Sequence, residues 1–172
     1  ITHEDFYASA QKLAQYRRNS GLRVAAPVKI TDIYDEFNYG IFNPQAIRDF
    51  LSYAYNNWVA PAPTYVLLVG DACQDYKDNF KTGTKNYVPT QLIETDILGE
   101  TPSDNWFVLL SGNDILPDMF IGRLSVETKS QADAIVDKII YYEQYPPKNT
   151  WDKKALFVAD DDESSFEKMS NQ

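Results

Sequence analysis

A single cysteine and several carboxylates stand together in the stretch TYVLLVGDACQDYKD, just after a run of apolar residues. A nucleophilic cysteine needs a neighbouring base or a positive field to form its thiolate. The one histidine of the chain, His3, lies seventy residues earlier, at a terminus that we expect to fray. Asp71, Asp75 and Asp78 add negative charge beside the thiol and disfavour the thiolate. Cys73 is therefore interpreted as a small packing residue.

A second acidic stretch, SGNDILPD, could bind a metal ion. It places Asp114 and Asp118 four residues apart in a loop that contains glycine and proline. Such a loop can surround a hard cation with carboxylates and main-chain carbonyls, which calcium prefers. The spacing is not that of an EF-hand. From the spacing alone, an ordinary solvated turn is the more common interpretation, and a calcium loop is the alternative.

A third stretch, ALFVADDDESSF, ends an apolar run in the carboxylates of Asp160, Asp161 and Asp162. This ending resembles the first strand of a phospho-acceptor receiver domain, which binds magnesium with such a pair. The rest of a receiver would have to follow Gln172.

The chain contains no phosphate-binding loop, no GxGxxG and no HExxH. Arg123, within IGRL, is expected to be a buried and paired arginine.

The elements that position these residues follow from the spacing of apolar side chains. Helical spacing and capping residues predict helices over 3–21, 43–58 and 128–145. Apolar runs predict strands at 22–30, 64–70, 86–95, 104–110, 118–124 and 154–162, and residues 31–40 read as a polar turn.

This order predicts a mixed α/β fold with a parallel sheet flanked by helices. Ligands gather at the carboxyl ends of the strands in such sheets. Gly70 and Asp71 follow one predicted strand there, and Asp160–Asp162 follow another.

Composition narrows the class of protein. The chain has 172 residues, 44% of them hydrophobic, so it can form one sizeable core. Its formal net charge of −9 argues against a nucleic-acid partner or an anionic membrane surface. No apolar run is long enough to span a membrane. One cysteine allows no internal disulfide, and no cysteine–histidine cluster is present for zinc.

Five blocks in register carry a family resemblance: IYDEFNYGIFNPQAIRDFL, YVLLVGDACQDYKD, VPTQLIETDILGETPSDNWF, GNDILPDMFIGRLSVETKSQADAIVDKIIYYE and WDKKALFVADDDESSFE. Together they resemble the N-terminal part of the gingipain-like cysteine peptidases, the C25 family. The resemblance implies a caspase-like α/β/α sandwich, with residues 1–145 as its first subdomain. Residues 146–172 would be a linker and the first strand of a truncated second, catalytic subdomain.

The resemblance also implies roles for individual residues. The family binds structural calcium between two loops that correspond to Asp71 and to Asp114, Leu116 and Asp118, with Leu116 offering its carbonyl oxygen. The catalytic cysteine and histidine of the family would lie beyond Gln172. Asp162 matches the acid that orients the histidine, although the gingipain position is a glutamate.

The sequence therefore predicts a fragment of an extracellular or cell-surface cysteine endopeptidase that acts on proteins or peptides. The fragment would supply scaffold and calcium loop, would have the rest of its own catalytic domain as partner, and would be inactive alone. The alternative is a non-catalytic α/β binding module of the same fold. The predicted cofactor is calcium, with no nucleic-acid partner and no membrane span.

Overall fold

The computed structural model describes residues 1–112, 114–146 and 153–156. The chain divides into two compact units, residues 1–140 and residues 141–172, and the following description concerns the first. The predicted domain boundary between residues 145 and 146 stays a prediction. The described elements are, in chain order, η1 (Glu4–Phe6), α1 (Tyr7–Asn19), α2 (Ile30–Asn38), α3 (Gln45–Asn57), β1 (Tyr65–Val69), β2 (Gln91–Thr95), β3 (Gly99–Ser103), η2 (Asn105–Val108), β4 (Phe120–Leu124) and α4 (Lys129–Gln144).

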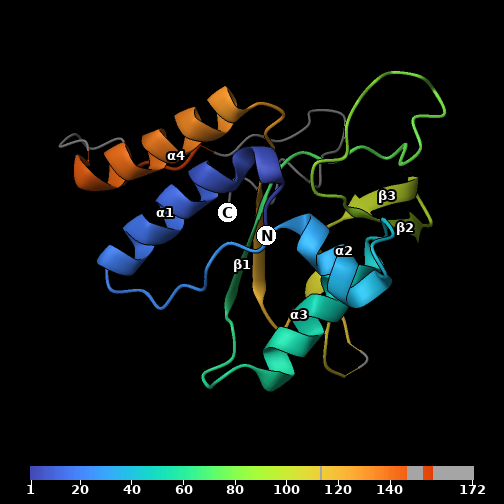
Figure 1. The fold of residues 1–172 in the computed structure, drawn as a ribbon, viewed down its shortest axis with the longest axis horizontal. Coiled ribbons are helices and arrows are strands. Elements are labelled where there is room, and N and C mark those ends of the chain that lie inside the picture. Colours follow the sequence, from blue (N-terminus) through green and yellow to red (C-terminus); the bar gives the residue numbers. More distant parts are fainter. Residues whose placement is uncertain (113, 147–152, 157–172) are drawn as a thin grey trace. The chain divides into compact units, whose positions relative to one another are not determined.

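A parallel pair of strands lies between two layers of helices (Figure 1). β1 and β4 pair in register from Tyr65 opposite Phe120 to Val69 opposite Leu124. Helices α2 and α3 lie on one side of this pair. Helix α1 and the part of α4 that belongs to the first unit lie on the other side (Figure 1). This arrangement confirms the predicted parallel sheet flanked by helices.

Two neighbouring residues of β1 show why a continuous apolar run was needed. Leu68 is fully buried in the core that contains α2, α3 and η2. Val69 is buried in a second core, with Phe6 before α1 and Ala132 in α4. Successive side chains of a strand point to opposite faces, so this end of β1 needs apolar residues at both positions.

The N-terminal residues extend this sheet. Thr2 forms parallel bridges with Lys29 on one side and with Val69 on the other, and its side chain is buried. The main-chain N–H of His3 donates to the carbonyl oxygen of Val69 at 3.3 Å. The expectation of a frayed terminus is therefore wrong, because the first residues fill a strand position beside β1.

Helix ends follow the predicted capping residues. The side chain of Asn43 accepts a hydrogen bond from the N–H of Gln45 at 2.9 Å at the start of α3. Thr128 and Gln131 form the reciprocal capping box, with distances of 3.2 Å and 3.1 Å between donor and acceptor. Gly21 ends the first helix region with a φ of 90°.

Several predicted elements are wrong. Residues 22–28 form no strand, and Lys29 makes only an isolated bridge. The predicted polar turn at 31–40 is α2, because Ile30, Ile33 and Tyr34 lie at helical spacing and are buried. Residues 105–108 form a 3-10 helix in place of a strand, and Phe107 and Val108 are both fully buried there. β3, which pairs antiparallel with β2, was not predicted.

Candidate functional site

The carboxyl ends of β1 and β4 meet at one edge of the sheet. After β1, the N–H of Gly70 donates to Leu124 at 3.0 Å and the N–H of Asp71 donates to Val126 at 2.9 Å. Gly70 has a φ of 139°, and a Cβ atom there would lie 2.8 Å from Cβ of Tyr87. Only glycine fits this position, because the incoming chain at Tyr87 passes too close for a side chain.

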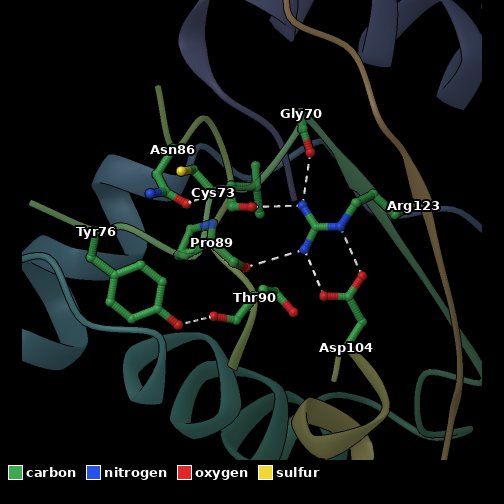
Figure 2. Close-up of polar contacts among 9 residues, drawn as sticks. Gly70, Cys73, Tyr76, Asn86, Pro89, Thr90, Asp104 and Arg123 are labelled. Atoms are coloured by element: carbon green, nitrogen blue, oxygen red, sulfur yellow. Dashed lines mark hydrogen bonds and ion pairs between the residues drawn. The ribbon is translucent and has the colours of Figure 1, made fainter. Parts of the chain in front are cut away.

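Arg123 of β4 is the centre of this edge (Figure 2). Its Nε and Nη2 donate to the two carboxylate oxygens of Asp104, at 2.8 Å and 2.7 Å. Its Nη1 donates to the carbonyl oxygens of Gly70 and Val88, at 2.7 Å and 2.6 Å, and Nη2 also donates to Pro89 at 3.1 Å. All five N–H donors of the guanidinium therefore have an acceptor.

This pairing makes Arg123 a structural residue. Its side chain is 11% exposed and that of Asp104 is 25% exposed. The buried charge is offset by a bidentate carboxylate, and three main-chain carbonyls receive the remaining donors. The expected buried and paired arginine is confirmed. The contacts tie together the end of β1, the chain at Val88 and Pro89, and the residue before η2.

Cys73 lies in the loop that leaves this edge (Figure 2), and its main-chain N–H donates to Oδ1 of Asn86 at 2.8 Å. The free thiol is half-buried. His3 is ordered, but its Nδ1 accepts from the N–H of Asp5 at 3.1 Å, and none of the hydrogen bonds among the described residues joins it to Cys73. The interpretation of Cys73 as a packing residue stays a prediction.

The predicted metal ligands Asp114 and Asp118 both bind their own loop. Oδ2 of Asp118 accepts from the N–H groups of Leu110 and Ser111, at 2.7 Å and 2.8 Å. Oδ1 of Asp114 accepts from the N–H of Leu116 at 3.0 Å. The bond to Asp114 forms an Asx-turn, and the two bonds to Asp118 close the loop between its ends.

Asp71 lies after β1 and uses its main-chain groups in the sheet edge, where its carbonyl oxygen accepts from Tyr87 and Val88. Among the residues that the structure describes, no three acidic, histidine or cysteine side chains gather closely enough to hold a metal ion. A calcium site here would have to draw on main-chain oxygens, such as that of Leu116, and calcium binding stays a prediction. Asp162 lies outside the described residues.

Asp75 anchors the loop that projects beyond this edge. Its carboxylate accepts from the N–H of Phe80 at 2.7 Å and from Nδ2 of Asn79 at 3.1 Å. The main-chain N–H of Phe80, followed by that of Asn79, holds the pKa of Asp75 below its usual value. Nearby, the hydroxyl of Tyr76 donates to the carbonyl oxygen of Thr90, and burial raises the pKa of that hydroxyl.

Comparison with known families and structures identifies the architecture. The model of peptidase family C25 matches residues 1–172. The chain belongs to peptidase family C25. No curated protein sequence matches it. In the part of the chain that the structure describes, none of the helices is long and apolar enough to cross a membrane.

Three solved structures are similar to the chain. A crystal structure of dimeric latent PorU from Porphyromonas gingivalis has a TM-score of 0.68 and 24% identity over 97% of the chain. A complex of RgpB pro- and mature domains from the same organism has a TM-score of 0.60 and 25% identity over 83% of the chain. The Arg-specific cysteine proteinase gingipain R (RgpB) has a TM-score of 0.59 and 25% identity over 81%.

The chain spans only part of these proteins: 18% of the PorU chain, and 28% and 27% of the two RgpB chains. The similarity confirms the gingipain-like α/β fold of this C25 member. Sequence reasoning missed the role of Asp104, because no spacing rule connects it with Arg123. The sequence did offer one indication: an arginine inside a predicted strand, whose charge requires a carboxylate partner somewhere in the fold.

Proposed function

We propose that the chain is the first subdomain of a larger cysteine endopeptidase of family C25, extracellular or at the cell surface, followed by the opening strand of the second subdomain. The observation that carries this proposal is the family match over residues 1–172. The chain spans less than a third of each similar structure, and no hydrogen bond among the described residues joins Cys73 to His3. The nucleophile and its histidine are therefore assigned to sequence outside these residues.

In this proposal the full enzyme attacks a peptide bond of a protein substrate with a cysteine thiolate that a histidine activates. The described residues hold the frame. Arg123 and Asp104 fix the carboxyl edge of the sheet, against which the remainder of the catalytic domain would fold. Asp162, by its match to the family position, would orient and charge-stabilise the histidine.

The proposal is tested on a protein that continues past Gln172. Its peptidase activity should disappear on thiol alkylation, and Asp162→Asn should lower kcat about a hundredfold or more with little change in KM. Asp160→Asn is the matched control in the same acidic run and should keep full activity. Equal activity of both variants removes Asp162 from the mechanism. A protein that lacks thiol-dependent activity would instead be the non-catalytic binding module.

We also propose that calcium binds at the loop of Asp114, Leu116 and Asp118 together with Asp71. Support comes from the two carboxylates of this loop and from the family resemblance. A ligand that binds only the folded state raises the melting temperature. Calcium should therefore raise the Tm of the wild-type chain, and a chelator should reverse the rise.

The variant for this test is Asp114→Asn, which should lose the increment in Tm. Asp118→Asn is unsuitable, because it also weakens the acceptor of two main-chain N–H groups. Glu36→Gln, an exposed position on α2, is the matched control and should keep the increment. If the chelator leaves the Tm of the wild-type chain unchanged, calcium does not bind here, and the peptidase proposal is unaffected.

A further inference from the structure

One loop of the chain is exposed without interruption. Residues 77–85, here called the tip, are all exposed, and they project as a wide green excursion between Tyr76 and Asn86 (Figure 1). The tip has a defined shape, because Asp75 accepts from the N–H of Phe80 and Asp78 accepts from the N–H of Gly83 at 3.1 Å. The carboxylate of Asp78, the one acid of the tip, thus has its hydrogen-bond donor within the loop.

The cations of the tip are not satisfied in this way. The tip contains Lys77, Lys81 and Lys85 against the single acid Asp78, so its formal charge is +2, while the whole chain carries −9. No described residue forms an ion pair with any of these three lysines. The ammonium group of Lys85 lies 5.9 Å from the centre of the Tyr87 ring.

An open hollow lies at the base of the tip. It has a volume of about 410 Å³. Its aromatic lining comes from Phe42, Tyr76 and Tyr87, and its charged lining comes from Lys77 and Lys85 together with Asp75 and Asp78. The aromatic part of this lining suits an aromatic side chain, and the net positive charge of the tip suits a segment that carries negative charge. Phe80, which is 75% exposed, adds apolar surface on the tip itself.

We infer that the tip and this hollow form a docking surface for an acidic polypeptide segment that carries an aromatic residue. The unpaired lysines supply the electrostatic complement, and the hollow supplies the anchor for the aromatic side chain. A long nucleic acid fits less well, because it would extend from a +2 loop over the surface of a strongly acidic protein. The inference goes beyond the proposed peptidase and does not depend on it.

The test measures binding of a fluorescent peptide, made of Asp and Glu around a central Phe, to the 172-residue chain by anisotropy. Wild-type chain should bind it with an affinity that falls as salt rises. The triple variant Lys77→Gln, Lys81→Gln and Lys85→Gln should bind at least about tenfold more weakly, because each exposed charge contributes a modest share. A peptide with Ala in place of the Phe should also bind more weakly.

A matched control separates the local effect from net charge. The triple variant Lys12→Gln, Lys129→Gln and Lys138→Gln removes the same number of charges from α1 and α4, and its affinity should stay within about twofold of wild type. The inference is overturned if the chain does not bind the peptide at about 1 mM. It is also overturned if a Lys-rich peptide binds as well, if the control variant loses as much affinity, or if single-stranded DNA or anionic vesicles bind better.

Discussion

The segment between β1 and β2 has two parts that are stabilised in different ways. Its stem, residues 71–76 and 86–90, is bound to the sheet through Arg123, and the bond from Cys73 to Asn86 joins the two sides of the stem. The hydrogen bonds of the tip, residues 77–85, to described residues stay within the tip or go to Asp75. The stem groups that bind the sheet or join the two sides of the stem are therefore part of the global fold. The polar groups of the tip, and the carboxylate of Asp75 that binds them, determine only local shape. The stem and the tip should therefore respond differently to mutation.

The largest effect is expected at Arg123. Arg123→Met leaves the carboxylate of Asp104 and three main-chain carbonyls without their donors, and should lower the free energy of unfolding by about 3–5 kcal/mol. Urea unfolding measures this loss. Arg123→Lys keeps the positive charge but lacks the planar guanidinium. Its free energy of unfolding should lie between those of Arg123→Met and the wild type. A loss below about 0.5 kcal/mol for Arg123→Met would show that the stem does not depend on the arginine.

A smaller effect is expected at Asn86, within the stem. Asn86→Ala removes the acceptor of the Cys73 N–H and should cost about 1–2 kcal/mol in urea unfolding. Asn56→Ala is the matched control, because its side chain donates to the carbonyl of Ser52 on the exposed surface of α3. Its cost should stay within about 0.5 kcal/mol. Equal losses in free energy of unfolding for the two variants would show that the part-buried amide of Asn86 stabilises the fold no more than the exposed amide of Asn56.

The smallest global effect is expected at Asp75, the stem residue whose carboxylate binds the tip. The pKa of Asp75 is lower in the folded state, so its contribution is present above the unfolded pKa of about 3.9 and is lost as pH falls through the folded value. Hydrogen exchange should show protection of the Phe80 amide near neutral pH that declines in acid. Asp75→Asn should weaken that protection at neutral pH with little change in the midpoint of global unfolding. A large shift of that midpoint would mean that the tip is not a local unit.

The sequence predicted most of what the sheet requires. The apolar run of β1 is buried on two faces, the capping residues of α3 and α4 make the expected bonds, and the pairing of Arg123 was expected. The strand at 22–30 was wrong because an apolar run alone does not specify a neighbour, and Thr2 already occupies the position beside β1. The helix at α2 was missed because its polar residues obscured the buried stripe of Ile30, Ile33 and Tyr34.

The candidate site was less predictable than the fold. Cys73 was set aside because His3 is distant in sequence and the neighbouring carboxylates disfavour a thiolate. Its hydrogen-bond partner Asn86 and the contact between Arg123 and Asp104 depend on tertiary contacts between distant segments. Such pairings carry no local signature, since any carboxylate or amide in the chain could serve. The acidic loop at Asp114 and Asp118 was recognised as a loop, but spacing could not show that its carboxylates accept main-chain N–H groups.

We propose that this chain is a C25 scaffold in which Cys73 takes no part in catalysis. The direct measurement is incubation of the purified 172-residue chain, and of its Cys73→Ser variant, with a general protein substrate such as casein. We expect that neither protein releases more peptide from the substrate than buffer alone does. Both should have the same free energy of unfolding within about 0.5 kcal/mol. Cleavage by the wild-type chain that Cys73→Ser abolishes would contradict it.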